Sequence, residues 1–244
     1  LTPDVAPPPL MPLRRRIELM GALGLDLTWV IPFTPEFSRM TPEQFVQTIL
    51  VRRFHATAVV VGNNFAFGRA RAGNLALLRR LGQTAGIRVI ALPAVVRGGR
   101  PVSSSRIRQV VQGGEMQAAH RLLGRPFELS GTVVRGVGRA RRLGFPTANV
   151  RLDPTVVPPR GVYRVWLSHR GQRWQGLMNL GIRPTFGGGS LTCEVHLPGF
   201  RGDLYRHVVT IACLARLRDE RRFDSPGALT RQIRRDLAQA GFAR

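Results

Sequence analysis

The sequence predicts two regions of different fold class, an α/β region followed by an all-β region. In the first half, strand and helix segments alternate, which is the pattern of a parallel sheet with helices packed against it. After Phe127, short alternating strands are separated by glycine-rich turns, as in an antiparallel barrel or sandwich. The sequence pattern changes near Gly124 to Pro126, so we place the domains at 1–125 and 126–244.

The elements of the α/β region are predicted mainly by their end signals. Thr41 and Pro42 together form a helix start, because a capping residue is followed by proline at the first helical position. Gly73 or Asn74 begins another helix, which runs through Gly82. The full set is helices at 13–23, from 41 onward, at 74–82, from the 102–108 segment through 112 and at 116–123, with strands at 27–33, 58–62 and 88–92.

The all-β region contains short apolar runs with polar residues between them, and it ends in a helix. Period-two alternation bounded by glycine is the strand signal used here. The terminal helix extends from about Ser225 to Ala240. The predicted strands are 131–135, 161–168, 173–180, 192–197 and 208–216.

Composition excludes several classes of protein. The 244 residues are 43% hydrophobic, and no run approaches the 18 apolar residues that a membrane span requires. No secretory signal is visible, so we expect a cytoplasmic protein with no membrane partner. Cys193 and Cys213 are too few for a disulfide framework, and we expect both to be buried apolar residues. No feature of the sequence indicates a homo-oligomer.

The net charge is +23, and every basic side chain is arginine. Clustered positive charge binds polyphosphate backbones, which would favour a nucleic-acid partner. The arginines are instead spread along the chain, aromatic residues make up only 7%, and no basic-aromatic RNA-binding pattern occurs. We therefore do not expect nucleic acid to be the physiological partner.

The segment from Gly131 to Val150 has the character of a phosphate and metal site. Its glycines, Gly136 among them, allow the backbone to approach a ligand closely, and Arg141 is one of several arginines able to neutralise phosphate. Thr147 and Asn149 are two residues apart, so on an extended segment both side chains point to one face. Both offer hard oxygen ligands suited to Mg²⁺. A capped surface loop explains the same residues equally well.

A second candidate phosphate site lies at a predicted helix start after Pro101. The run Ser103, Ser104 and Ser105 is followed by Arg106 and Arg108, and helix N-termini accept anions. Serine capping of the helix is the alternative reading of these hydroxyls.

The second half resembles the riboflavin kinase family. The motifs occur in the family's order over residues 127–244: GFPTANV, GVY, NLGIRPTF, CEVHL, DLY and LRDERRF. Residues 13–126 resemble the later part of the adenylyltransferase domain of the bifunctional bacterial riboflavin kinase/FAD synthetase, through VVVGNNFAFGRARAGN, VSSSRIR and LLGRPF. The resemblance implies a partial Rossmann-like nucleotidyltransferase domain. It also implies a six-stranded antiparallel Greek-key β-barrel with a C-terminal helix.

The resemblance also implies a reaction and its residues. ATP would phosphorylate the 5′-hydroxyl of riboflavin, with FMN and ADP as products. Glu194 matches the catalytic carboxylate, a role that makes sense for orienting a weak hydroxyl nucleophile and accepting its proton. The implied Mg²⁺ ligands are Thr147 and Asn149, the implied ATP contacts are Gly136, Arg141, Thr147, Asn149, Leu197 and Tyr205, and the implied flavin contacts are Arg218, Arg221 and Phe223.

Two positions stand apart from these transferred roles. His196 lies two residues after Glu194, and hence on the same strand face, but no family role transfers to it. Arg206 stands where the family usually has glycine after DLY, so we expect an altered or unusually basic turn there.

The family's adenylyltransferase would convert FMN and ATP to FAD and pyrophosphate through an HxGH motif. The motif does not occur among these 244 residues, and the sequence begins where the family would have passed it. We therefore expect riboflavin kinase activity with little or no FAD synthetase activity. The residues retained from that second site are Gly62, Asn64, Phe65, Ser103, Ser104, Arg106 and Arg108.

Two other interpretations remain open. The sequence fits a truncated product or fragment of the full bifunctional enzyme, whose parent would carry both activities. It also fits a non-catalytic barrel that holds flavin nucleotides or RNA through its positive field. Loss of ATP consumption in a Glu194→Gln variant separates an enzyme from such a binding protein.

Overall fold

The computed structural model describes residues 6–136, 138–183 and 190–242. It divides into two compact units, and the first comprises mainly Asp26–Val102. The second joins Pro7–Leu25 to Ser103–Arg244. This physical division at Val102 and Ser103 differs from the functional boundary expected at 125 and 126, which stays a prediction.

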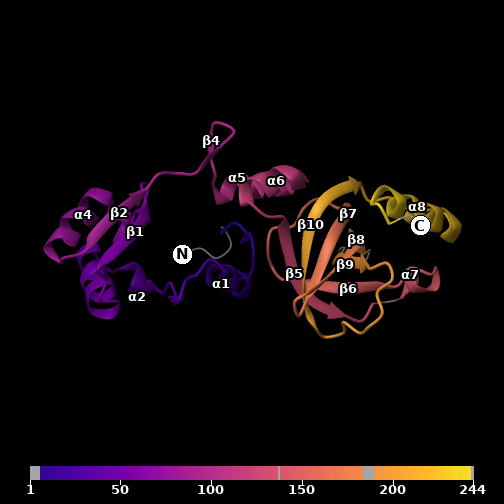
Figure 1. Ribbon diagram of the computed structural model, residues 1–244, viewed down its shortest axis with the longest axis horizontal. Helices are drawn as coiled ribbons and strands as arrows, with labels where there is room; N and C mark the ends of the chain where they lie inside the picture. The colour runs from indigo at the N-terminus through magenta and orange to yellow at the C-terminus, as the bar shows by residue number, and fades with distance from the viewer. Residues whose placement is uncertain (1–5, 137, 184–189, 243–244) are drawn as a thin grey trace. The chain divides into compact units, whose positions relative to one another are not determined.

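The first unit is built around a two-stranded parallel sheet (Figure 1). Strands β1 (Ala58–Gly62) and β2 (Arg88–Leu92) have the predicted bounds and pair in register, Ala58 with Arg88 through Gly62 with Leu92. Helix α4 (Leu75–Thr84) connects them and begins at Asn74, whose side chain accepts a hydrogen bond from the Leu77 amide at 3.0 Å. The predicted strand–helix–strand arrangement is therefore confirmed.

Short elements complete this unit. Thr41 caps α3 (Pro42–Phe45), as its sequence predicts, and also forms a reciprocal capping box with Gln44. The helix continues as the π-helical segment η2 (Val46–Arg53). Val46, Phe67 and Leu78 form its buried core. The remaining elements are α2 (Pro35–Ser38), the 3₁₀ turn η3 (Arg69–Arg71), β3 (Val96–Arg97) and β4 (Arg100–Pro101).

The strand predicted at 27–33 is wrong. These residues have no regular secondary structure, and no strand of the described residues pairs with them. Leu27 is 73% exposed and Phe33 is 61% exposed, so the apolar run that suggested a buried strand is not buried. An apolar run specifies a strand only where a neighbouring strand can satisfy its backbone.

The second unit is a closed six-stranded antiparallel barrel with strand order β10-β5-β6-β9-β8-β7 (Figure 1). Strands β7, β8 and β9 follow one another, and β10 returns beside β7, which is a Greek key. The predicted barrel is confirmed, but β6 was missing from the strands read from the sequence. The strands are β5 (Phe127–Val134), β6 (Thr147–Leu152), β7 (Gly161–His169), β8 (Gln172–Arg183), β9 (Ser190–His196) and β10 (Val208–Arg218).

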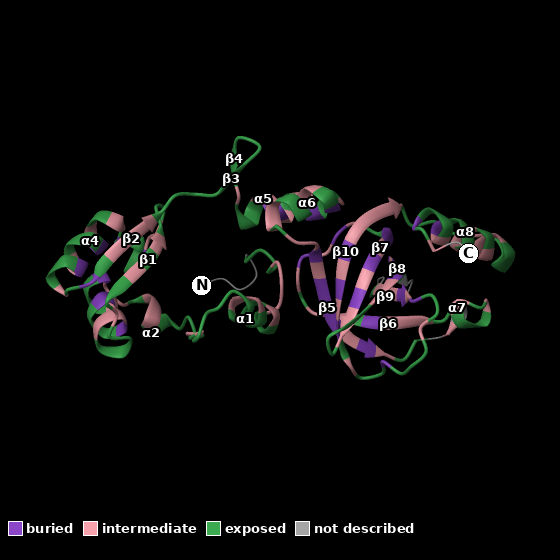
Figure 2. Cartoon of the chain, viewed as in Figure 1, coloured by how far each residue is buried: buried purple, intermediate pink, exposed green. Residues whose placement is uncertain are grey.

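Alternate side chains of these strands fill the barrel interior, which appears as purple bands along the strands in Figure 2. Tyr163, Leu167, Met178, Leu180 and Ile211 are fully buried. The unit's helices are α1 (Leu13–Ala22), α5 (Ser104–Gln112), α6 (Met116–Leu123), α7 (Arg139–Arg142) and α8 (Pro226–Gln239).

Helix α8 follows the end of β10 and begins at Ser225, whose hydroxyl accepts from the Ala228 amide at 3.2 Å. Its apolar side packs against the barrel through Leu237, beside a cluster of Val162, Leu177 and Ala240. The predicted terminal helix is confirmed, and it forms part of the wall of the cavity described next.

Candidate active site

Three polar side chains are aligned across adjacent barrel strands. In the antiparallel register Asn149 of β6 lies opposite Glu194 of β9, and Glu194 lies opposite Asn179 of β8. Directly opposed residues project from the same face of a sheet with their Cβ atoms about 4.5–5.5 Å apart. The register thus sets a carboxylate between two amides, a neighbourhood that sequence reasoning could not supply because the three strands are far apart in the chain.

A cavity of about 1260 Å³ opens on this face of the barrel unit. Its walls come from β6, β7, β8, β9, the end of β10 and helix α8. It brings together five of the predicted site residues, namely Thr147, Glu194, Arg218, Arg221 and Phe223. This volume accommodates a large polar ligand together with its reaction partner.

The fit of a divalent cation rests on Thr147 and Asn149. The two side chains project from one face of β6, as expected for residues i and i+2 of a strand, and both are partly buried. The Asn149 amide lies against the backbone of Gly136, where a Cβ would overlap with it. The described residues contain no group of three or more His, Cys, Asp or Glu side chains able to hold a metal. One hydroxyl and one amide suit Mg²⁺ when substrate phosphates supply further ligands.

Other predicted ATP contacts do not line this cavity. Arg141 is exposed on α7, and Tyr205 is 50% exposed in the loop before β10, where its amide donates to Asp203 at 2.7 Å. Leu197 is buried, only 6% exposed. Part of the NLGIRPTF motif, residues 184–186, lies outside the described residues.

The turn after DLY has the backbone of a glycine turn although the residue is Arg206. Its φ is +62°, in the left-handed region that glycine favours. Its amide donates to the Val133 carbonyl at 3.0 Å, which holds the turn against β5. Arg206 therefore adds a basic side chain and backbone strain to the turn, and the turn has a left-handed conformation.

Arg218 is not a free cation. Its guanidinium makes a bidentate ion pair with Asp236 of α8, with Nη2 to Oδ2 at 2.7 Å and Nε to Oδ1 at 2.9 Å. Its Cζ also lies 5.9 Å from the centre of the Phe223 ring. Arg218 and Phe223, both implied flavin contacts, thus form one packed group with Asp236, which the sequence did not single out.

His196 is a second residue that sequence reasoning left without a role. It lines the cavity two residues from Glu194, and its Nδ1–H donates to the Pro146 carbonyl at 2.9 Å. Its ring also packs edge-on against Phe145, with centroids 5.6 Å apart. His196 therefore ties the strand of Glu194 to the chain that leads into Thr147. The alternation of side-chain direction along β9, which puts His196 on the same face as Glu194, was the signal in the sequence that pointed to it.

The residues expected from the adenylyltransferase site fall in two places. Gly62 is the last residue of β1 in the first unit and Asn64 and Phe65 follow it, with the Phe65 amide donating to the Gly62 carbonyl at 3.0 Å. Ser103, Ser104, Arg106 and Arg108 belong to the second unit. Ser103 caps α5 by accepting from the Arg106 amide at 3.3 Å, as the capping reading proposed, and Arg108 donates to the Pro8 carbonyl at 2.8 Å.

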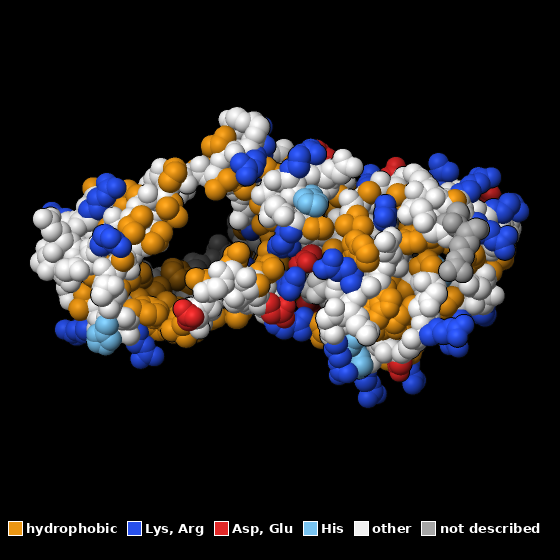
Figure 3. Space-filling view, in the orientation of Figure 1, with side chains coloured by type: hydrophobic (Ala, Val, Ile, Leu, Met, Phe, Trp, Pro, Cys, Tyr) orange, Lys and Arg blue, Asp and Glu red, His pale blue; other side chains and the backbone are white. Residues whose placement is uncertain are grey.

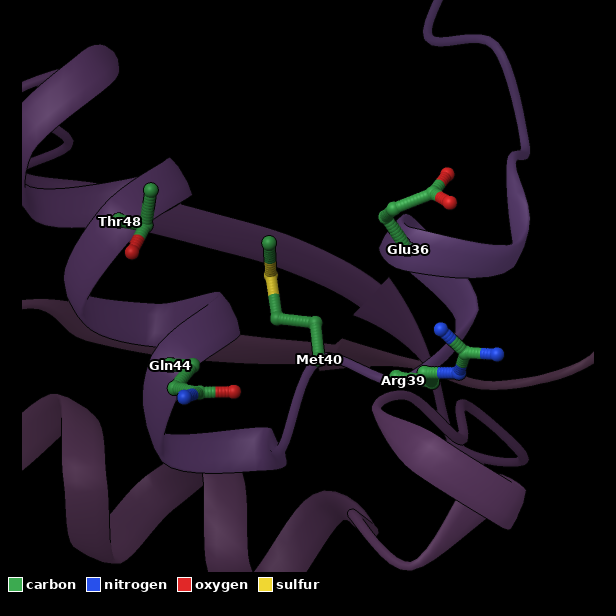
Figure 4. Close-up of a pocket in the computed structure, with 5 residues that line it drawn as sticks. All are labelled: Glu36, Arg39, Met40, Gln44 and Thr48. Carbon is green, nitrogen blue, oxygen red and sulfur yellow. The ribbon is translucent and has the colours of Figure 1, made fainter.

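The first unit has a smaller hollow of about 450 Å³ (Figure 4). Glu36 and Arg39 reach it from the α2 region, Gln44 from α3 and Thr48 from η2, with Met40 extending between them. None of the predicted site residues lines it. Opposite charges and a half-buried thioether give no arrangement that resembles a reaction centre.

Burial explains the two cysteines. Both thiols are buried in the barrel, as predicted, and burial raises the pKa of Cys213 to about 12. Burial also raises the pKa of Cys193 well above its usual range. Both thiols are protonated at neutral pH, so neither acts as a nucleophile.

Comparison with known proteins places both halves of the chain. The riboflavin kinase family model matches residues 123–242, and the FAD synthetase model matches residues 1–106. A bifunctional riboflavin kinase/FMN adenylyltransferase from Pseudomonas fluorescens is 39% identical over 98% of this chain and 77% of its own length. The chain belongs to the bifunctional riboflavin kinase/FMN adenylyltransferase family.

A second relative agrees with this membership, and a solved structure shares the fold. The bifunctional riboflavin kinase/FMN adenylyltransferase of Escherichia coli K12 is 35% identical over 96% of this chain and 75% of its own length. A crystal structure from Streptococcus pneumoniae, described as a macrolide-efflux protein, superposes with a TM-score of 0.86 at 29% identity, over 96% of this chain and 76% of that one. Within the described residues, no helix is both long and apolar enough to cross a membrane.

Proposed function

We propose that the barrel unit transfers the γ-phosphoryl group of ATP to the 5′-hydroxyl of riboflavin, giving FMN and ADP. The observation that carries this proposal is the alignment of Asn149, Glu194 and Asn179 beside the large cavity. Family membership indicates the substrates, and Glu194 lies at the cavity, where its carboxylate can accept a proton from a bound hydroxyl. We also propose that the protein works in the cytoplasm, where ATP is available.

Glu194 acts as the general base in this proposal. As the ribityl oxygen forms its bond to the γ-phosphorus, the bond from that phosphorus to the bridging oxygen of ADP breaks. The hydroxyl proton passes to the Glu194 carboxylate. Orientation by a general base of this kind typically contributes about 10²–10⁴-fold to the rate.

The rest of the site positions its ligands. Phe223 offers an aromatic face to the flavin ring, while Arg142, Arg160, Arg221 and Arg222 line the same cavity with positive charge. Phosphoryl transfer depends mostly on such positioning and charge neutralisation. Thr147 and Asn149 would hold Mg²⁺ on the ATP side, where the bound ion would neutralise phosphate charge.

Glu194→Gln tests the proposal. The amide keeps the shape of the side chain but cannot accept the proton, so we expect kcat for FMN formation to fall by about 10²–10⁴-fold while riboflavin still binds. Chromatography of the products from riboflavin and ATP-Mg²⁺ measures this. Glu115→Gln, an exposed carboxamide substitution outside the cavity, is the matched control. Unchanged FMN formation in Glu194→Gln would remove the general-base role.

The same chromatogram distinguishes the other readings. A non-catalytic flavin-nucleotide or RNA-binding barrel would consume no ATP even as the wild type. It also reports FAD, which we expect this 244-residue polypeptide to form from FMN far more slowly than it forms FMN, because its sequence contains no HxGH. FAD formation at a comparable rate would show that Gly62–Phe65 and Ser103–Arg108 suffice for adenylyl transfer without an HxGH motif.

The face of the barrel unit shown in Figure 3 gives no support to the RNA alternative. On the face shown in Figure 3, the arginines of the barrel unit are interspersed with uncharged and hydrophobic side chains. A positive surface of this mixed kind favours small anionic ligands in a cavity over a continuous nucleic-acid track.

A further inference from the structure

Asp236 is a buried carboxylate that the proposed reaction does not use directly. It is 2% exposed, and Ser130 is the only other buried polar residue in the described parts of the chain. Three groups donate to its carboxylate: Arg218 through Nε and Nη2, and Gln232 through Nε2 at 2.9 Å. A buried charge is tolerated only when it is paired and hydrogen-bonded in this way.

The partner of this carboxylate is fixed from several sides. The backbone of Arg218 pairs with Val162 of β7 and packs so closely on Gly161 that a Cβ there would overlap with its carbonyl. Its Nη1 donates to the Asp219 carbonyl at 2.9 Å, which also fixes the start of the next turn. One guanidinium therefore joins the end of β10, the following turn and helix α8.

The same group forms a wall of the cavity. Arg218, Phe223, Leu229, Ile233 and Asp236 all line it, so the connection from β10 to α8 is shaped where a flavin would lie. The guanidinium sits 5.9 Å from the Phe223 ring, a separation that favours a cation–π contact. Without its carboxylate, Arg218 loses the partner that sets the plane of its guanidinium.

Helix α8 has a second attachment that does not depend on the ion pair. Leu237 and Phe242 pack with Leu217 against buried Val162 and Leu177. An isosteric change at Asp236 therefore leaves this apolar contact in place. Loss of the charge should act on Arg218 and Phe223 more than on the docking of the helix.

We propose that Asp236 is a positioning residue for the flavin substrate, acting through Arg218 to fix Phe223 and the α8 wall of the cavity. Gln232 assists by donating to Oδ1, the oxygen that also accepts from Arg218 Nε. This inference rests on the proposed kinase function, and it concerns the flavin side of the site alone. The ATP side, at Thr147 and Asn149, is built from a different strand and shares no hydrogen bond with this group among those found in the described residues.

Asp236→Asn tests the proposal. Hydrogen bonds to charged groups are worth enough that we expect KM for riboflavin to rise about 10-fold, with kcat and KM for ATP within about 2-fold of wild type. Quenching of riboflavin fluorescence on binding gives the same change as a Kd, without catalysis. Asp224→Asn, an exposed carboxylate on the same connection that does not line the cavity, is the matched control.

A purely structural role predicts a different pattern. It would lower the melting temperature and the active fraction while leaving KM and Kd for riboflavin unchanged, and that result overturns the proposal. If Asp236→Asn does not fold, Gln232→Ala decides, because it keeps the ion pair and loses one hydrogen bond. We expect it to raise KM for riboflavin about 2- to 5-fold, and no change would overturn the proposal.

These outcomes separate this inference from the proposed function. If the wild type forms no FMN, the kinase proposal fails. If the wild type forms FMN and both variants bind riboflavin as it does, only the positioning role of Asp236 fails.

Discussion

The closed barrel and the two-stranded sheet of the first unit use β-structure in different ways. Every barrel strand has two neighbours, and its side chains separate into a fully buried interior and a face that carries polar groups. Strands β1 and β2 pair only with each other among the described strands, and all of their residues are exposed or half-buried. Val60 is 57% exposed, whereas Met178 in the barrel is fully buried.

Closure matters because it fixes geometry from both sides of a strand. Glu194 lies between Asn149 and Asn179 because β9 is paired with β6 and with β8 in defined registers. A one-residue slip would move Glu194 to the opposite face, which the buried Cys193 and Val195 prevent. In the first unit, Gly62 ends a strand with a single partner and Asn64 and Phe65 follow it, so the positions of Asn64 and Phe65 depend on a local turn.

The largest expected difference between the two regions is in stability. Met178→Ala removes a fully buried side chain and should lower the free energy of unfolding of the barrel by about 2–5 kcal/mol. Val60→Thr changes an exposed position and should alter stability by about 0.5 kcal/mol or less. Urea unfolding followed by tryptophan fluorescence measures both.

The fluorescence signal can be assigned to each region. Trp166 and Trp174 lie in the barrel and Trp29 in the first unit, so a Trp29→Phe background reports the barrel alone. A cost below about 1 kcal/mol for Met178→Ala would mean that the barrel interior repacks easily, contrary to the contrast drawn above.

Local signals in the sequence were enough to predict the elements whose ends are marked by nearby residues. Strands β1 and β2 and helix α6 have the predicted bounds, and Asn74 and Ser225 cap helices as expected. These signals depend on residues within three or four positions of each other. The run at 27–33 was misassigned because nothing local tells whether an apolar segment finds a partner strand.

The site was only partly predictable for the same reason. Motif resemblance pointed to Glu194 and Phe223, which the cavity brings together, but their neighbours are set by strand register. Asp236 was missed because it lies 18 residues from Arg218 and has the appearance of a solvated residue on a basic helix. The strand β6 was missed although its six residues alternate between polar and apolar side chains, because the segment was interpreted as part of a ligand-binding loop.

A smaller effect, on KM for ATP, is expected at Gly136, whose backbone lies against Asn149 of β6. A Cβ at residue 136 would overlap with the Asn149 amide, so Gly136→Ala should displace that side chain and raise KM for ATP by about 10-fold, the equivalent of about 1.4 kcal/mol. Initial rates at varied ATP-Mg²⁺ measure this. Gly227→Ala on α8 is the control, because a Cβ there would make only an ordinary van der Waals contact with the Arg231 side chain. An unchanged KM for ATP would show that Asn149 does not need its observed position.

The smallest effect concerns strain, which both regions contain. Arg206 in the barrel has φ of +62° and His55 in the first unit has φ of +47°. A left-handed backbone costs an L-residue about 1–2 kcal/mol. Glycine avoids this cost, but its greater freedom in the unfolded state costs about 0.5–1 kcal/mol. Each substitution to glycine should therefore stabilise its own unit by up to about 1.5 kcal/mol, measured by urea unfolding.

The matched alanine variants decide whether strain is the cause. Arg206→Ala and His55→Ala keep the Cβ, so they should gain nothing, and a gain equal to that of glycine would instead assign the effect to the removed side chain. Arg206→Gly carries a further consequence, because its amide anchors the loop of Tyr205 to Val133. If only the barrel substitution stabilises, the strain at Arg206 is maintained by its hydrogen bond to β5, and His55 carries no strain that glycine relieves.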